Sequence, residues 1–223
     1  MPIDDASGLD TAHRDDSHDE LHVLFAGAPR PLLSTTAEER LGARHREVLD
    51  GLEAIVRDDG LSGFTIGELA ARLTCSRRTL YELAPSKDEL LLLVLDRFMH
   101  RIGRQAIAAI DPAATATEQL RQYVTANTDY AFRSAAYDDL TDTPGAHRLL
   151  DRHFRFAVTI IERLVTRGIE RGEIRDVNAS VVAAVLLSGT VHLAQPDVID
   201  DVGGDLGSAI DAMLDVVLRG LAG

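Results

Sequence analysis

Residues 65–90 constrain the fold more than any other stretch of the chain. Thr65, Ser76 and Ser86 each precede a segment with helical spacing of apolar residues, and Thr and Ser are preferred residues at helix N-termini. Glutamates follow the first and third of them at the spacing of a capping box. The helices that start after Thr65 and Ser76 are short and are separated by a tight turn at residues 74–76. The pattern predicts a helix-turn-helix followed by a longer helix.

The second of these short helices begins with Arg77, Arg78 and Thr79. Cations at a helix N-terminus are mildly unfavourable, which argues against a purely structural role. A helix-turn-helix places the N-terminal residues of its second helix on base edges in the DNA major groove. A guanidinium group matches guanine O6 and N7 there. We therefore expect these residues to face DNA; a solvated helix start is the alternative interpretation.

The charge of the chain is unevenly distributed. The 223 residues carry a net charge of −13, but residues 40–105 hold 11 basic and 10 acidic side chains, for a net charge of +1. The segments on either side each have a net charge of −7. A chain with this balance cannot bind DNA through its total charge, so any binding is expected to be local and salt-sensitive.

The remaining pattern predicts an all-α protein. Residues 1–35 are acidic, polar and broken by Gly and Pro, and we interpret them as a disordered arm. A first helix is expected from Thr36, with Glu39 completing a capping box, to Gly60. Pro85 is expected to end the second short helix, and a long helix to run from Ser86 to about Ile110. Further helices are expected at residues 115–135, 146–172, 178–195 and 205–220.

No catalytic motif appears in the sequence. It contains no glycine-rich phosphate loop, nucleophile elbow or zinc-ligand spacing, so we expect neither an enzyme nor a cofactor. A weak metal site at His13, His18 and His22 is an alternative to a solvated acidic arm. The uncharged stretch 177–196 is interrupted by polar side chains, which favours a buried helix and no membrane partner. The single Cys75 suits a reducing cytoplasm.

These residues together resemble the TetR family of bacterial transcriptional regulators. The resemblance covers about residues 44–95 and rests on Thr65-Ile66, Glu68-Leu69-Ala70, Ser76, Thr79-Leu80-Tyr81 and Ser86-Lys87-Asp88-Glu89-Leu90. It implies a homodimer that binds a palindromic DNA operator and is controlled by a small apolar or amphipathic ligand. It further implies phosphate contacts from Thr65 and Lys87, a backbone contact from Tyr81, and a recognition helix that Ser76 caps and that contains Arg77, Arg78 and Thr79.

The sequence departs from the family pattern at two places. Thr74 and Cys75 stand where the family often has Gly and Val, and a β-branched residue does not readily adopt the positive φ that Gly accepts. Leu83-Ala84-Pro85 comes shortly after the tyrosine and is expected to alter the approach to the next helix.

The expected architecture is an N-terminal three-helix DNA-binding domain at residues 36–95 and a C-terminal helical ligand-binding and dimerisation domain at residues 96–223. Polar and aromatic residues that interrupt apolar stripes are candidate ligand contacts, with core hydrogen bonding as the alternative for each. They are Tyr123, Asn127, Tyr130, His153 and Phe154. Helices 179–194 and 208–218, with small and β-branched faces, are expected to form the dimer interface. The function expected is a DNA-binding repressor; a regulator without a ligand, or an interaction module with a vestigial helix-turn-helix, are alternatives.

Overall fold

The computed structural model describes residues 26–61, 63–127, 143–203 and 205–221, and this part of the chain is built from α-helices without strands. The N-terminal helices are α2 (Thr35–Arg40), α3 (Ala43–Asp58), α4 (Ile66–Arg72) and α5 (Arg77–Leu83). They lead into the long α6 (Lys87–Ala108). The C-terminal helices are α7 (Ala116–Ala126), α9 (Pro144–Glu170), α10 (Ala179–Leu193), α11 (Pro196–Asp201) and α12 (Leu206–Arg219).

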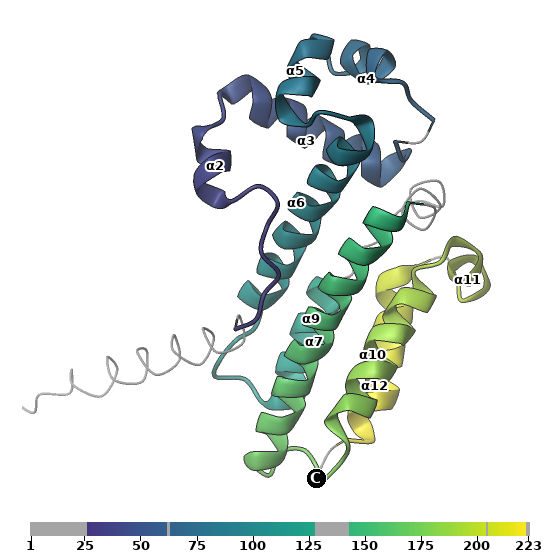
Figure 1. The fold of residues 1–223 in the computed structure, drawn as a ribbon. Coiled ribbons are helices and arrows are strands. Elements are labelled where there is room, and N and C mark those ends of the chain that lie inside the picture. Colours follow the sequence, from purple (N-terminus) through teal and green to yellow (C-terminus); the bar gives the residue numbers. More distant parts are fainter. Residues whose placement is uncertain (1–25, 62, 128–142, 204, 222–223) are drawn as a thin grey trace, which may run out of the picture.

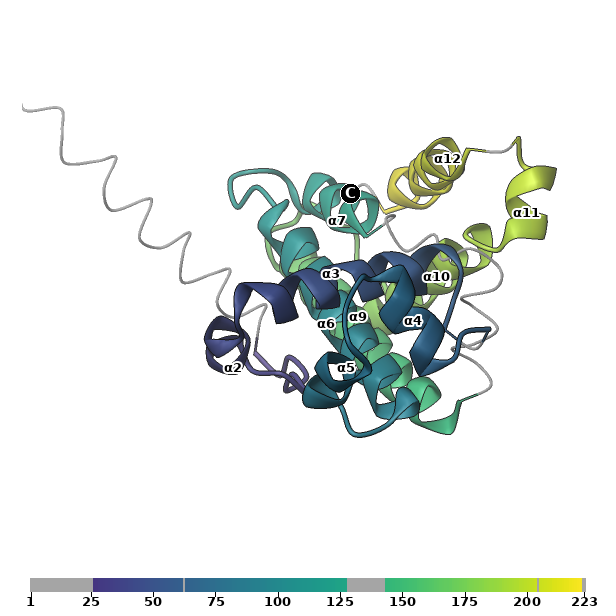
Figure 2. The same ribbon diagram turned by 90° about the horizontal axis from the view of Figure 1, so that it is seen from above.

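Helix α6 connects the two ends of the molecule. Its first turns lie beneath α3, α4 and α5, and its later turns run beside α7 and α9 (Figures 1 and 2). Helices α10 and α12 lie side by side on the far side of α9 from α6 (Figure 1). The fold is therefore an N-terminal helix-turn-helix unit attached to a C-terminal helical bundle, as the sequence predicted.

Buried apolar side chains form three clusters that α6 links. The N-terminal cluster includes Leu49, Leu52, Leu69 and Leu80, and the C-terminal cluster extends over α7, α9, α10 and α12. A third cluster, between α6 and the start of α9, contains Leu95, Phe98, Met99, Ile102, Ala146 and Leu149. Because α6 contributes residues to all three, the expected division after residue 95 falls inside a continuous helix.

Most predicted helix starts are confirmed. Thr65 and Glu68 form the complete capping box, and Ser86 accepts the amide of Glu89 at 3.2 Å. The predicted start at Thr36 is wrong, because Ser34 caps α2 instead and accepts the amide of Ala37. The expected single helix to Gly60 is also interrupted, because Leu41 and Gly42 are extended and separate α2 from α3.

The C-terminal helices lie close to the predicted ranges, with one addition. The sequence indicated only a break at Pro196, whereas Pro196 occupies the first turn of the short helix α11. Proline is well tolerated there because the first amides of a helix have no intrahelical acceptor. The predicted helix 115–135 is described as far as Ala126, and the rest of it lies outside the described residues. No described helix is long and apolar enough to cross a membrane.

The segment before α2 packs against the C-terminal helices. The sequence predicts a disordered arm over residues 1–35, of which residues 1–25, including His13, His18 and His22, lie outside the described residues. Residues 26–34 run along α6 (Figure 1), where the amide of Leu32 donates to Asp96 Oδ2 at 2.6 Å. Arg163 of α9 donates to the carbonyl of Ala26 at 2.9 Å. This segment therefore ties α6 to α9, which its composition did not predict.

The turn between α4 and α5 holds Thr74 in the left-handed region, with φ of 52°. The amide of Cys75 donates to the carbonyl of Ala70, and that of Thr74 to Ala71, which is the bonding pattern of a Schellman motif. Arg44 of α3 donates to the carbonyls of Leu73 and Thr74 at 2.9 and 2.5 Å. The tight turn is thus preserved despite the threonine, and external hydrogen bonds support it.

Buried charge fastens α2 and α3 to α6. The Arg97 side chain is 15% exposed and donates to Glu38 at 2.6 Å, to Asp50 at 2.8 Å and to the buried Glu53. Arg101 also binds Glu53, at 2.9 Å. Burial lowers the pKa of Arg97, but the hydrogen bond to Glu38 and the charge of Glu53 outweigh it and raise that pKa. The guanidinium therefore stays charged while it joins three helices.

Replacing Arg97 with methionine should destabilise the protein. The variant leaves the buried Glu53 with Arg101 as its cationic partner, and loss of one member of a buried ion pair costs roughly 3 kcal/mol. Urea unfolding at pH 7 measures the change. Arg219→Met is the matched control, because Arg219 is exposed and its pair with Asp215 should contribute under about 0.5 kcal/mol. Equal losses in the two variants would contradict the role of Arg97.

Replacing Thr74 with glycine should stabilise the protein. A β-branched residue in the left-handed region costs about 1–2 kcal/mol, which glycine avoids. We expect a higher melting temperature for Thr74→Gly by differential scanning calorimetry. The same substitution at the exposed helical Thr166 of α9 should lower the melting temperature, because glycine is a poor helix former. A decrease in both variants would show that the turn does not strain Thr74.

Candidate nucleic-acid interface

Helices α4 and α5 form the exposed end of the N-terminal unit (Figure 2). Leu69 of α4 and Leu80 of α5 are fully buried in the N-terminal cluster, which sets the angle between the two helices. Cys75, between them, is partly buried against the same cluster, and burial raises the pKa of its thiol. The inward apolar contacts leave the other side of α5 exposed to solvent.

The exposed side of α5 carries Arg77, Arg78 and Tyr81. The Arg78 side chain is 87% exposed, and Tyr81 is 52% exposed although it is a large aromatic residue. Thr79 is half-buried, and its hydroxyl lies 2.9 Å from that of Ser76. The predicted contact residues of α5 therefore share one solvent-facing region, with Thr79 also bonded within the helix start.

Arg77 lies against the beginning of α4. A Cβ atom placed on Gly67 would come within 2.6 Å of Arg77 Nη2, so the guanidinium covers the backbone of Gly67 directly. A larger residue at position 67 would displace Arg77. The glycine thus allows the first arginine of α5 to lie beside the first turn of α4, a contact that sequence reasoning did not identify.

Arg78 is paired with an acid on the same helix. Its Nε donates to Glu82 Oε1 at 2.9 Å, and Glu82 is also 3.1 Å from His45 of α3. The hydrogen bonds from Arg78 and then His45 lower the pKa of Glu82, so this carboxylate stays ionised at neutral pH. This ion pair could have been predicted from the sequence, because oppositely charged side chains four residues apart on a helix are neighbours. Glu82 reduces the positive charge of the face.

Residues at two other helix starts complete the face. The Thr65 hydroxyl donates to Glu68 at 2.8 Å and accepts the amide of Glu68, so it is engaged in capping α4. The Thr65 backbone amide also donates to Glu68, at 2.7 Å, and this bond and the one from the hydroxyl lower the pKa of Glu68, with a smaller effect from the charge of Lys87 at the start of α6. The structure therefore gathers the seven predicted DNA-contact residues on α4, α5 and the start of α6.

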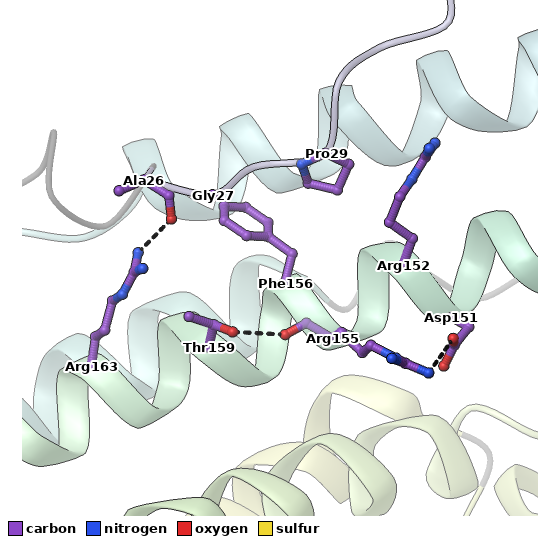
Figure 3. A pocket seen from close by; sticks show the side chains of 9 residues that line it. All are labelled: Ala26, Gly27, Pro29, Asp151, Arg152, Arg155, Phe156, Thr159 and Arg163. Atoms are coloured by element: carbon purple, nitrogen blue, oxygen red, sulfur yellow. Dashed lines mark hydrogen bonds and ion pairs between the residues drawn. The ribbon is translucent and has the colours of Figure 1, made fainter.

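A separate groove of about 410 Å³ lies between α9 and the segment that precedes α2 (Figure 3). The Phe156 ring points toward Gly27 and Pro29, Arg152 and Arg163 of α9 lie on either side of it, and Arg155 extends away from it (Figure 3). Its lining consists of Ala26, Gly27, Pro29, Asp151, Arg152, Arg155, Phe156, Thr159 and Arg163. Arg155 pairs with Asp151 at 2.8 Å, so part of this charge is balanced locally.

The four predicted ligand contacts that the structure describes do not line this groove. Tyr123 is buried in the C-terminal cluster, and Asn127 ends α7 with its amide donating to the Tyr123 carbonyl at 2.8 Å. Phe154 is partly buried, and Tyr130 lies outside the described residues. His153 is buried against Asp96 of α6, 3.3 Å away. Sequence reasoning therefore missed Phe156 and the arginines, because the segment opposite them was expected to be disordered.

Asp96 and His100 of α6 form a buried polar group with His153. Burial raises the pKa of Asp96, but hydrogen bonds from His153 and the Leu32 amide outweigh it, so the pKa is lowered. Burial lowers the pKa of His100 more than the charge of Asp96 raises it. The carboxylate is therefore ionised and the His100 imidazole is neutral at pH 7.

No protein-family model matches the sequence, and no curated protein matches it. Solved structures do match the fold. A TetR-family regulator from Agrobacterium tumefaciens superposes with a TM-score of 0.65 at 15% identity, covering 81% of this chain and 98% of that one. Another match is the transcriptional regulator FadR from Bacillus subtilis in complex with stearoyl-CoA, with a TM-score of 0.64 at 16% identity over 79% and 99% of the chains.

A third match is a transcriptional regulator from Saccharomonospora viridis in complex with choline, with a TM-score of 0.65 at 20% identity over 80% and 97% of the chains. Each match extends over nearly the whole of the known structure, so the similarity includes the C-terminal helices as well as the helix-turn-helix. The chain has the fold of TetR-family transcriptional regulators.

Proposed function

We propose that the protein is a sequence-specific DNA-binding repressor controlled by a small-molecule ligand. The observation that carries the proposal is the exposed face of α5, where Arg77, Arg78 and Tyr81 project from a helix held in place by Leu80. Cationic and aromatic side chains on a short exposed helix are suited to the major groove and its phosphates. The likeness to solved transcriptional regulators supports the same function.

In the proposed complex, α5 enters the major groove with its N-terminal residues toward the bases. Arg77 and Arg78 reach base edges or phosphates, and Tyr81 contacts the backbone. The helix starts at Thr65 and Lys87 approach phosphates on either side, since helix N-termini bind anions. The face is small and the chain as a whole is acidic. We therefore expect binding to weaken steeply as salt concentration rises.

The proposed active form is a homodimer joined through α10 and α12. Helix α10 contains no Asp, Glu, Lys or Arg, and its exposed positions include Val181, Ala184, Val185 and Ser188 at helical spacing. Val216 of α12 is 77% exposed. Gly189 allows Met213 to approach α10 closely, which brings the two helices together into one surface. An exposed apolar surface on paired helices is typical of a two-fold interface.

The proposed ligand is small and apolar or amphipathic. The groove between α9 and residues 26–29 has a volume within the range of small-molecule sites and combines Phe156 with arginines. Regulators of the same fold have been solved with stearoyl-CoA and with choline, two chemically different molecules, so the fold accepts varied ligands. By linkage, a ligand that lowers DNA affinity must itself bind more weakly to the DNA-bound protein.

The opposite charges of Arg78 and Glu82 give a two-directional test of the DNA-binding face. Arg78→Ala should weaken binding to a mixed-sequence DNA duplex about five- to tenfold. It should also reduce the slope of log affinity against log salt concentration by about one. Glu82→Gln should strengthen binding, because it removes a carboxylate from the face and releases Arg78 from its 2.9 Å pair. Fluorescence anisotropy at several salt concentrations measures both effects.

Charge-matched controls separate the local effect from the change in net charge. Arg219→Ala and Glu170→Gln alter the charge by the same amounts at exposed positions at the C-terminal ends of α12 and α9. They should leave the affinity within about twofold, since charges beyond a Debye length are screened. If the controls change the affinity as much as the substitutions on α5 do, DNA does not bind through this face.

Substituting a charge into α10 tests the proposed dimer. Val185→Asp places a carboxylate in the middle of the exposed apolar stripe and should convert the protein to monomers, because an unpaired charge is costly to bury. Sedimentation-velocity centrifugation at micromolar concentration measures the mass. Thr166→Asp, at an exposed position of α9, is the control and should remain dimeric. A dimeric Val185→Asp variant would place the interface elsewhere.

A further inference from the structure

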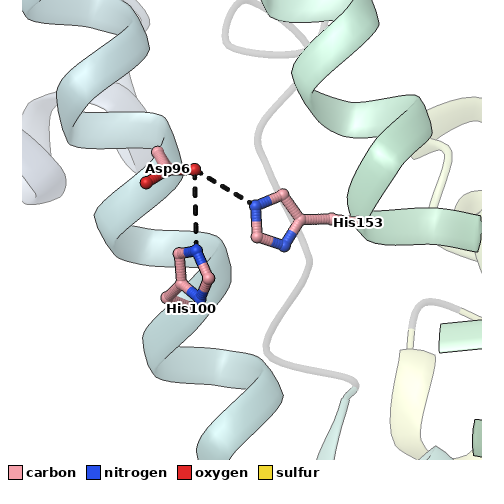
Figure 4. A group of neighbouring side chains, drawn as sticks. All are labelled: Asp96, His100 and His153. Atoms are coloured by element: carbon pink, nitrogen blue, oxygen red, sulfur yellow. Dashed lines mark hydrogen bonds and ion pairs between the residues drawn. The ribbon is translucent and has the colours of Figure 1, made fainter. Parts of the chain in front are cut away.

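Three metal-binding side chains converge between α6 and α9, away from the DNA-binding face. Asp96 and His100 stand one turn apart on α6, and His153 faces them from α9 (Figure 4). The Asp96 and His153 side chains are 1% and 6% exposed, and that of His100 is 13% exposed. Polar groups of this kind are rarely buried together unless each has a partner.

The spacing of the donor atoms fits a metal ion. His153 Nε2 lies 3.3 Å and His100 Nε2 lies 3.7 Å from the same oxygen, Asp96 Oδ1. One donor atom from each residue lies within 4.8 Å of the others. A tetrahedral ion with bonds of about 2.1 Å needs ligands about 3.4 Å apart, so modest side-chain adjustment would bring all three into coordination.

One of these atoms has no partner in the described structure. His100 Nε2 is fully buried and forms no hydrogen bond, because its 3.7 Å distance from Asp96 is too long for one. The two imidazole rings meet edge to face, with centroids 4.8 Å apart, and the Nε2 atom of each approaches the same carboxylate oxygen. A purely structural polar cluster would be expected to satisfy this nitrogen.

The surroundings of Asp96 orient its carboxylate for coordination. The Leu32 amide donates to Oδ2 at 2.6 Å and leaves Oδ1 directed toward the two imidazoles. Arg152 of α9 donates to Oδ1 at 3.2 Å and supplies a positive charge at the same oxygen. Because the Arg152 side chain is 45% exposed, it can move into solvent when another cation takes its place.

We propose that Asp96, His100 and His153 bind a divalent first-row transition-metal ion such as Zn²⁺. Two imidazoles and one carboxylate suit these ions better than Mg²⁺ or Ca²⁺, which favour oxygen ligands. Three protein ligands leave at least one coordination position for water or a small molecule. The bound ion links α6 directly to α9. The site does not depend on the proposed DNA binding, which a separate assay measures.

Titration of the full chain with Co²⁺ and with Zn²⁺ tests the proposal. Co²⁺ reports its geometry through visible absorption, and Zn²⁺ binding is followed by calorimetry. We expect one ion per chain, with the affinity reduced at least tenfold in His100→Phe and in His153→Gln. Arg152→Gln should bind the ion more tightly than the wild type, because it removes the cation that competes for Asp96 Oδ1.

Two controls test whether the ion binds to other histidines and whether His100→Phe loses binding because it is less stable. The triple variant His13→Ala, His18→Ala and His22→Ala removes the imidazoles of the N-terminal region and should keep the binding, which excludes that region as the site. His100→Phe should melt without metal at or above the wild-type temperature, because the nitrogen it removes has no partner. Wild-type protein that binds neither ion, or a His100→Phe variant that folds and binds both as the wild type does, would overturn the proposal.

Discussion

Two neighbouring charges on α6, Asp96 and Arg97, impose the constraint on which the arrangement of the helices depends. Both are largely buried, and a buried charge is unfavourable unless partners compensate it. Consecutive residues on a helix point about 100° apart, so the two side chains must find partners on different sides. Arg97 finds acids on α2 and α3, and Asp96 finds the Leu32 amide, Arg152 and His153.

Because of this constraint, α6 joins the N-terminal helices to the C-terminal bundle in the proposed regulator. The helix starts at Lys87, one of the proposed DNA contacts, holds α2 and α3 through Arg97 near its middle, and packs on α7 and α9 beyond it. The candidate ligand groove lies on α9 and shares Arg152 with the Asp96 cluster. In the proposed function, a ligand that displaces Arg152 would change the charge beside Asp96, the residue of α6 next to Arg97. This pair is the proposed connection between ligand binding and the position of α5.

Local signals in the sequence were sufficient for most of the fold. Capping at Thr65, the stop at Gly60 and the break at Pro85 depend on residues within one or two turns, and the structure agrees with each. The helix-turn-helix itself was also predictable, because it is a local motif; the DNA contacts assigned to its residues stay a prediction. Thr74 was expected to disfavour the tight turn. The Arg44 hydrogen bonds that support this turn could not be predicted, because Arg44 lies 30 residues away in the sequence.

The features that were missed depend on distant contacts. Arg97 meets Glu38 across 59 positions, Asp96 meets His153 across 57, and Arg163 meets Ala26 across 137. No periodic pattern records such pairs. For the same reason the groove between Phe156 and the segment before α2 was not predicted. Pro196 was correctly predicted to end the preceding helix. That it also begins α11 depends on whether residues 197–201 form a helix.

Selection of binding sites from a random duplex pool tests the proposed DNA-binding face of α4 and α5 most directly. The protein, as the proposed dimer, is expected to enrich a palindrome whose half-sites present successive major grooves, about 34–36 Å apart. The variant that combines Arg77→Ala with Arg78→Ala should lose that enrichment while remaining folded. Absence of any enriched sequence at low salt from folded wild-type protein, or the same palindrome selected by the double variant, would contradict the assignment of this face.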